Sequence, residues 1–146
     1  MFDALLRRLL APAPTALAAP EAHLALAALL VRVARADGTY DPTEALRIDR
    51  VLAALYQLSP FAAAQLRAEA EQLETEAPDT VRFTRALKEA VPLGQRAALM
   101  EGLWSVALAD GGRGDEEDQI IRLVANLLGL TDRDSALARQ RVERGA

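Results

Sequence analysis

The chain has 146 residues, with 17 Lys and Arg against 21 Asp and Glu, and it contains 31 Ala and 25 Leu but only 11 Val and Ile. Because helix formers dominate and strand formers are scarce, we predict one all-α domain. The absence of Cys excludes disulfides, thiol catalysis and Cys-ligated metals. The chain has a single His (His23), which excludes multi-histidine metal sites, and its net charge of −4 argues against a nucleic-acid partner.

Residues 1–20 are predicted to form an N-terminal amphipathic helix and a Pro/Ala linker, ahead of a helical domain over residues 21–146. Apolar residues follow helical spacing at Phe2, Leu5, Leu6, Leu9 and Leu10, and prolines at 12, 14 and 20 follow. This helix either docks on the domain or acts as a partner-binding or membrane-surface helix, since Arg7 and Arg8 would suit a headgroup layer. It does not resemble a secretory signal, and the apolar run over 23–31 is far shorter than the roughly 20 residues of a membrane span. We therefore expect a cytoplasmic protein with no integral membrane segment.

The first part of the domain is predicted to contain three helices. Residues 21–36 are apolar at almost every position except Arg32 and Arg35, which predicts a helix buried on all sides. After a polar loop over 37–40, Asp41, Pro42 and Glu44 have the spacing of a capping box that starts a helix ending near residue 56. We expect its inner side to carry Leu46, Val51, Leu52 and Leu55. The third helix is expected from residues 59–60 to about 75, with an outer face carrying Arg67, Glu71 and Glu74.

The second part begins with a short predicted helix over 81–91, which Pro92 ends. The next, over 95–109, is nearly as apolar as the helix over 21–36, and we expect its Met100 and Trp104 in the core. A polar loop over 110–114 precedes a predicted helix over 115–128. Gly129 is expected in the left-handed conformation at the end of that helix, and residues 131–134 are expected to cap a last helix that ends at about residue 143. His23 is expected to be a packed or capping residue. Residues 111–114 are glycine-rich but lack the strand and the Lys-Ser/Thr of a phosphate-binding loop.

The chain contains an internal repeat. Residues 30–38 align with residues 103–111 at a constant offset of 73, and the same offset pairs Glu44 with Glu117, Ile48 with Ile121, Val51 with Val124 and Leu55 with Leu128. Each copy consists of a buried helix, an Ala-Asp-Gly loop and a second helix. Two such units commonly pack about a pseudo-twofold axis, so we predict a pseudo-symmetric bundle of about seven to eight helices.

The first acidic loop is a candidate metal site. Asp37 follows the C-terminal end of a helix, where the negative end of the helix dipole disfavours a carboxylate unless a cation is shared. Together with Asp41 and Glu44 it supplies an oxygen-only set suited to Ca²⁺, Mg²⁺ or Mn²⁺. The competing interpretation is that Asp41 and Glu44 only cap a helix and Asp37 only starts a turn. An EF-hand is excluded because Ile48 stands where its closing Glu is needed.

The pattern Ala36-Asp37-Gly38 with Asp41 and Glu44, repeated as Ala109-Asp110-Gly111 with Glu117, resembles the TerB family of tellurite-resistance proteins, which is related to the N-terminal domain of DjlA co-chaperones. The resemblance covers about residues 22–130. It implies a pseudo-symmetric all-α bundle, a role in bacterial stress response, and an acidic cluster that binds divalent metal. Carried over by position, the metal ligands are Asp37, Asp41, Glu44, Asp110 and Glu117. Gly114 stands where the family has Asp, so the second half of the site is expected to be weak or lost.

Two functions remain open. The chain is either a metal-binding stress-response domain or a metal-free scaffold of co-chaperone type whose acidic cluster docks partner proteins. We do not expect an enzyme, because no nucleophile, basic stabilising group or cofactor motif accompanies the acids in the sequence. Protein partners are expected, nucleic acid is not, and homodimer formation is left open.

Overall fold

The computed structural model describes residues 19–36, 38, 40–76, 87–88, 91, 93–109 and 115–145, without the side chains of 19–20 and 115–117. These residues are helical and contain no strand. Six α-helices are present: α2 (Ala19–Arg35), α3 (Pro42–Tyr56), α4 (Pro60–Glu76), α6 (Arg96–Ala107), α7 (Asp115–Leu127) and α8 (Asp132–Gly145), with a 3₁₀ turn η1 (Leu93–Gln95) before α6. The all-α prediction is confirmed. Of the seven to eight helices predicted, the one over 2–10 and its linker lie outside the described residues, as does most of the one over 81–91.

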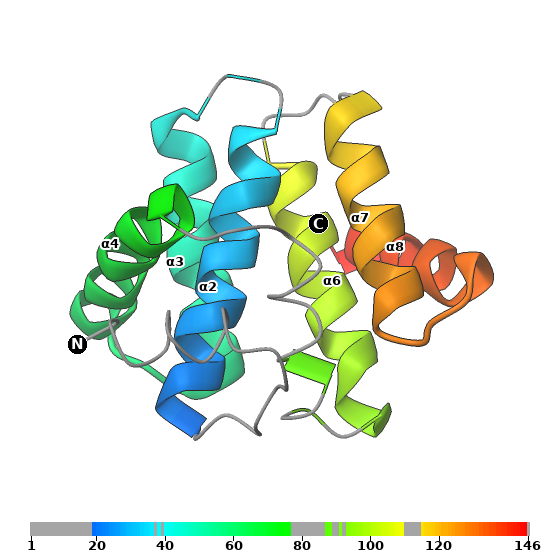
Figure 1. Cartoon of the computed structure of the whole chain (residues 1–146), viewed down its shortest axis with the longest axis horizontal. Helices are drawn as coiled ribbons and strands as arrows, with labels where there is room; N and C mark the ends of the chain where they lie inside the picture. The colour runs from blue at the N-terminus through cyan, green and yellow to red at the C-terminus, as the bar shows by residue number, and fades with distance from the viewer. Residues whose placement is uncertain are drawn as a thin grey trace.

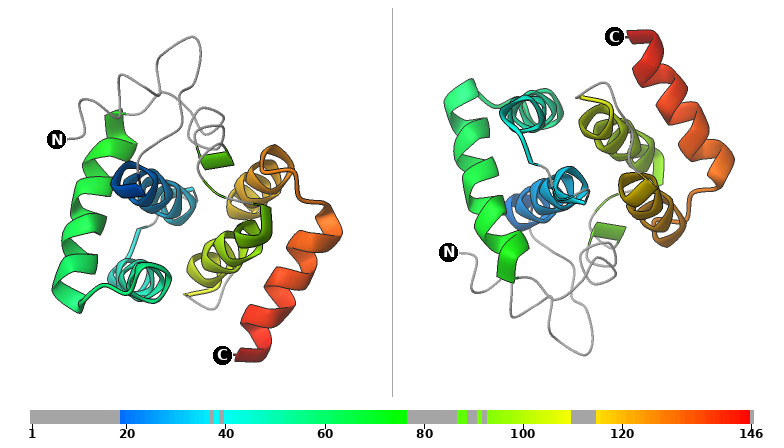
Figure 2. Two further views of the ribbon diagram at one scale, coloured as in Figure 1. Left: turned by 90° about the horizontal axis from the view of Figure 1, so that it is seen from below. Right: turned by 90° about the horizontal axis from the view of Figure 1, so that it is seen from above.

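The helices form two groups that pack against each other. In Figure 1, α2 and α6 run side by side in one direction, and α3 and α7 return in the opposite direction. Figure 2 shows α4 lying across α2 and α3 on one side, and α8 across α6 and α7 on the other. Two of the pairs of positions that the repeat matches are fully buried in both copies: Leu30 with Leu103, and Ile48 with Ile121. The pseudo-twofold relation between the two units stays a prediction.

Helix α2 is the centre of the hydrophobic core, as its all-round apolar sequence predicts. Every residue from 25 to 31 is at most 1% exposed, because α3, α4, α6 and α7 all pack on this helix. Across the bundle, α3 and α6 approach closely at Gly102, where an added Cβ would lie 3.0 Å from Cγ1 of Val51. A larger residue at this position would therefore push the two helices apart.

The predicted helix ends are largely confirmed by hydrogen bonds. The N–H of Ala62 donates to Oγ of Ser59 at the start of α4, and at α8 the N–H of Asp134 donates to Oγ1 of Thr131. Gly129 has φ +80° after α7, in the left-handed region where glycine is favoured. At that helix end, Nη1 of Arg96 donates to the carbonyl oxygen of Leu128.

The inner face of α3 differs from the prediction at one residue. Ile48, Val51 and Leu52 are buried, but Leu46 is 59% exposed. A helix turns by about 100° per residue, so a side chain two positions before Ile48 points to nearly the opposite face. The expectation that Leu46 lies on the inner side is therefore wrong.

His23 is a packing residue, as expected. Its ring stacks on that of Tyr56, with the ring centroids 3.6 Å apart. Burial lowers the pKa of His23 below its usual value of 6.5 and raises the pKa of Tyr56 to about 12. The folded state thus favours the neutral form of both side chains.

Acidification is expected to destabilise the protein through His23. The unfolded chain protonates this residue near pH 6.5 and the folded chain only at lower pH, so the unfolded state binds more protons and stability falls as the pH drops below about 6.5. A His23→Gln variant is expected to lose this part of the pH dependence, measured as the urea midpoint at about pH 7.5 and about pH 5. An identical pH dependence in the two proteins would contradict the prediction.

In the part of the chain that the structure describes, no helix is both long enough and apolar enough to cross a bilayer.

Candidate metal site at one end of the bundle

The helix ends that flank the two acidic loops lie at the same end of the bundle. Helix α2 ends there and α3 begins there, and the same holds for α6 and α7 (Figure 1). Since α2 packs against α6, the segments that join these helix pairs start and finish close together. The topology therefore brings together the helix ends that flank the two acidic loops, and residues 37, 39 and 110–114 themselves lie outside the described residues.

Asp41 and Glu44 are brought together by the start of α3. Asp41 is the N-cap, and its Oδ1 accepts the N–H of Glu44 at 2.9 Å, while Oε1 of Glu44 accepts the N–H of Asp41 at 3.3 Å. The predicted capping box is thus confirmed. The box uses one oxygen of each carboxylate, and a carboxylate can accept through both oxygens. Capping and metal ligation are therefore compatible in these two residues.

Glu44 is unusual because its charged side chain is buried. It is 1% exposed, and the only other buried polar residue among those described is Ser135. Glu44 also makes an interaction in addition to its capping bond. Burying a carboxylate is costly unless hydrogen bonds or positive charge compensate it. The capping bond and this further interaction offset part of that cost, and a metal ion bound at this end of the bundle would offset more of it.

The other three predicted ligands are not placed by the structure. Asp37 and Asp110 lie outside the described residues, and Glu117 lies in α7 without a described side chain. Among the side chains that are described, no group of three or more His, Cys, Asp or Glu could hold a metal ion. The proposed set of five acids therefore remains a prediction, of which the structure brings together Asp41 and Glu44.

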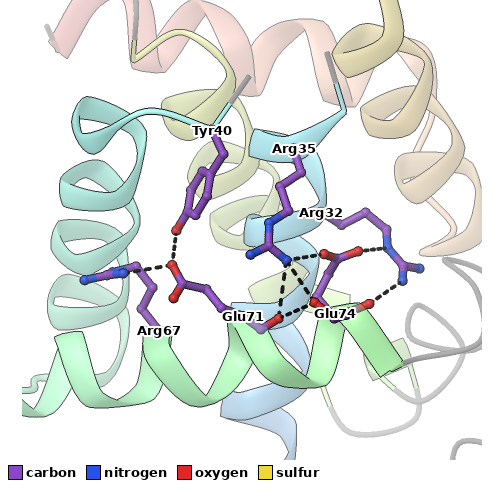
Figure 3. A network of polar contacts seen from close by, with 7 residues as sticks. Arg32, Arg35, Tyr40, Arg67, Glu71 and Glu74 are labelled. Atoms are coloured by element: carbon purple, nitrogen blue, oxygen red, sulfur yellow. Dashed lines mark hydrogen bonds and ion pairs between the residues drawn. The ribbon is translucent and has the colours of Figure 1, made fainter. Parts of the chain in front are cut away.

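A network of charged side chains, which we call the α4 network, lies beside the first acidic loop (Figure 3). Glu74 of α4 accepts from two arginines of α2: Arg35 Nη1 donates to Oε1 at 2.7 Å, and Arg32 Nε donates to Oε2 at 3.1 Å. The side chains of Glu74 and Arg32 are each 15% exposed. These ion pairs hold the C-terminal half of α2 against α4.

The α4 network continues to the residue that precedes the N-cap of α3. The hydroxyl of Tyr40 donates to Oε2 of Glu71 at 2.5 Å, and Arg67 Nη1 donates to the same oxygen at 2.9 Å. Arg67 Nε also donates to Oδ1 of Asp49 at 2.6 Å. Figure 3 shows the side chain of Tyr40 pointing to Glu71 on α4. The network therefore joins α2, the loop and α3 to one face of α4.

The surroundings of Tyr40 and Arg67 in the α4 network keep both side chains protonated. Burial and the neighbouring Glu71 raise the pKa of Tyr40 well above its usual value, so its hydroxyl keeps the proton that it donates. Burial opposes the charge on Arg67, but its hydrogen bonds to Asp49 and Glu71 outweigh this effect and raise its pKa. Three arginines face three carboxylates, so the network is balanced in charge.

This network corrects one expectation from the sequence. Arg67, Glu71 and Glu74 do not form an outer face of α4, because their side chains are only 22%, 25% and 15% exposed and turn toward α2 and α3. One feature of the sequence could have indicated this network: two arginines lie three residues apart on α2, and two acids, Glu71 and Glu74, have the same spacing on α4.

Removing the carboxylate of Glu74 is expected to destabilise the fold. A Glu74→Ala variant leaves Arg32 and Arg35 without their shared acceptor, and since all three groups are partly screened by solvent we expect a loss of about 2 kcal/mol in the free energy of unfolding. Urea denaturation measures it. The matched control is Glu76→Ala, which removes an exposed acid from the same helix and is expected to change stability by less than about 0.5 kcal/mol. Equal losses in the two variants would show that only net charge matters.

The comparisons with known proteins gave one match. The family model described as "Tellurite resistance protein TerB" matches residues 23–140. No curated protein and no solved structure matches the chain. The matched range includes both acidic loops, all six described α-helices in whole or in part, and the α4 network.

Proposed function

Because the chain belongs to the TerB family, we propose that it is a bacterial, cytoplasmic stress-response domain of the tellurite-resistance type that binds a divalent metal ion. The ligands in this proposal are Asp37, Asp41, Glu44, Asp110 and Glu117. The domain acts by binding and not by catalysis.

The observation that carries the proposal is the burial of Glu44 at the end of the bundle where both acidic segments start and finish. Glu44 is 1% exposed and is held in place by the capping box with Asp41. Helix α6 ends and α7 begins at this same end of the bundle (Figure 1), and Asp110 lies between these helices in the sequence. Gathering carboxylates in a region with little water raises their mutual repulsion, and a divalent cation relieves it.

The chemistry of the donor set selects the class of ion. Carboxylates supply only oxygen, and with backbone carbonyls and water they suit Ca²⁺, Mg²⁺ and Mn²⁺, whereas the absence of Cys and the position of His23 in a stack with Tyr56 leave no softer ligand. Gly114 replaces an acid of the family pattern in the second segment. The first segment therefore provides more of the binding than the second.

Calorimetric titration of the chelator-treated chain with Mn²⁺ tests the site. We expect binding by the wild type and a loss of at least about tenfold in affinity in Asp37→Asn and in Asp110→Asn, because each removes a charged ligand. The control is Asp132→Asn, which removes one negative charge from the first turn of α8 at an exposed position. Its affinity is expected to stay within about twofold of the wild type.

Two results would overturn the metal proposal. Either an absence of binding at millimolar Mn²⁺, or an equal loss in all three variants, would show that no specific site exists. The second candidate, a docking patch for partner proteins, then becomes the working model. Varying the salt concentration distinguishes the metal site from the docking patch. Affinity for a docked basic partner falls steeply with ionic strength, whereas a coordinated ion is removed by chelator at constant ionic strength.

A further inference from the structure

A cleft lies between α7 and α8, over the part of α6 that carries Trp104. Figure 2 shows α8 crossing α6 and α7, and the cleft between them has a volume of about 480 Å³, the size of a site for a small organic molecule. Its lining comes from all three helices and includes five charged side chains: Asp118, Arg122, Asp132, Arg139 and Glu143. Positive and negative groups thus face the same space.

Arg139 has donors that no described residue satisfies. Its Nε is buried and has no hydrogen-bond partner among the residues that the structure describes. Its Nη2 lies 3.6 Å from Oε2 of Glu143, which is beyond hydrogen-bond distance. A buried donor without an acceptor is costly, and an oxyanion that meets the Nε–Nη2 edge side-on supplies two acceptors. The cleft therefore favours a ligand with a carboxylate at Arg139.

We propose that this cleft binds a free α-amino acid with an apolar side chain. Arg139 and Arg122 hold the carboxylate of the ligand, and Glu143 holds its ammonium group. The apolar side chain lies against Trp104 and Ala136, which also line the cleft. This inference does not depend on the proposed metal site.

The charges of the lining favour a zwitterion over a simple anion. Two positive and three negative side chains surround the cleft, so a ligand with a carboxylate alone is repelled by the acids. In an α-amino acid the carboxylate and the ammonium are on the same carbon atom. Arg139 and Glu143 are likewise close together, one turn apart on α8 and 3.6 Å between Nη2 and Oε2. Such a ligand gives each of these two side chains a charge-assisted hydrogen bond.

Trp104 is held in a fixed position at the cleft. Its Nε1 donates to Oγ of Ser135 at 3.1 Å, and the guanidinium carbon of Arg139 lies 5.4 Å from its ring centroid. The apolar ring and the charge that holds the carboxylate are therefore placed side by side before a ligand arrives, which lowers the entropic cost of binding. Because Trp104 is the only tryptophan of the chain, its fluorescence reports on occupation of the cleft.

The test titrates L-phenylalanine and L-leucine into the full chain, with chelator present so that no metal ion contributes. The fluorescence of Trp104 is followed, and calorimetry measures the affinity independently. Two analogues serve as matched ligand controls: 3-phenylpropionate lacks the ammonium group of phenylalanine, and phenethylamine lacks its carboxylate. The protein variants are Arg139→Gln and Glu143→Gln, with Arg133→Gln as the control at an exposed position of α8 outside the lining.

We expect saturable binding of at least one of the two amino acids. Where phenylalanine binds, each analogue is expected to bind at least about tenfold more weakly, because it lacks one of the two charged groups. Arg139→Gln and Glu143→Gln are each expected to lose at least about tenfold in affinity, whereas Arg133→Gln stays within about twofold of the wild type. Circular dichroism checks that each variant is folded, and since Glu143 lies at an exposed position, its variant tests the site even if Arg139→Gln loosens α8.

Three results would overturn the inference. The first is the absence of saturable binding by either amino acid up to its solubility limit. The second is binding of 3-phenylpropionate as tightly as phenylalanine, since the acids would then have no part in recognition. The third is an equal loss of affinity in all three variants, which would show an effect of net charge alone. Each result leaves the metal proposal unaffected, because the titrations contain no free metal ion.

Discussion

Replacing Trp104 by alanine is expected to lower the free energy of unfolding by about 3–5 kcal/mol. Trp104 is the only tryptophan of the chain, is 7% exposed, and lies on α6 beneath α8. Its Nε1 donates to Oγ of Ser135 at 3.1 Å, and the guanidinium of Arg139 lies 5.4 Å from its ring centroid. The variant leaves a large cavity and also leaves the buried hydroxyl of Ser135 without this donor.

The effect is expected to be large because α8 has few other apolar contacts. Its only buried residues are Ser135 and Ala138, so the ring of Trp104 supplies much of the apolar surface on which the helix rests. Urea denaturation followed by far-UV circular dichroism measures the change, since the variant has no tryptophan fluorescence. Trp104→Phe keeps most of the ring and is expected to lose less, and Leu46→Ala, at a 59% exposed position, is expected to change stability by less than about 0.5 kcal/mol. A loss below about 1 kcal/mol in Trp104→Ala would contradict this role.

The parts of the fold that the sequence predicts well depend on local rules. The start of α3 at Asp41 and Pro42 follows from capping chemistry within four residues, and the left-handed Gly129 follows from the need to end α7. The burial of α2 follows from a run without a polar face. In each case the pattern that carries the prediction lies within one short stretch of the sequence.

The α4 network was missed because its partners are distant in the sequence. Charged residues at helical spacing usually face solvent, and nothing near Arg67, Glu71 and Glu74 indicates that α4 turns this face toward two arginines some forty positions away. The same holds for Tyr40, whose hydroxyl donates to Glu71, 31 residues further along the chain. Side-chain partners across a fold follow from how helices dock, which local periodicity does not specify.

The candidate metal site depends partly on residues that are close in the sequence and partly on residues that are distant in it. Asp41 and Glu44 are close in sequence, and their meeting in the capping box was predictable. Whether Asp110 and Glu117 come close to these two acids depends on how α2 packs against α6, which the repeat at an offset of 73 does not specify. The repeat relates the two acidic segments by position, and helix packing decides whether they are neighbours.

Metal binding through the acidic end of the bundle is the central claim, and thermal unfolding of the chelator-treated chain, titrated with Ca²⁺, Mg²⁺ and Mn²⁺ at fixed ionic strength, tests it most directly. An ion that binds the folded state is expected to add about 2.7 kcal/mol of stability at a hundred times its dissociation constant. For a domain of this size the midpoint then rises by roughly 5–10 °C.

The account predicts that at least one of these ions raises the midpoint by this amount, and that the rise disappears in Asp37→Asn while Asp132→Asn retains it. The same midpoint with and without each ion at millimolar concentration would contradict the claim, and the acids at this end of the bundle would then serve as helix caps and turns.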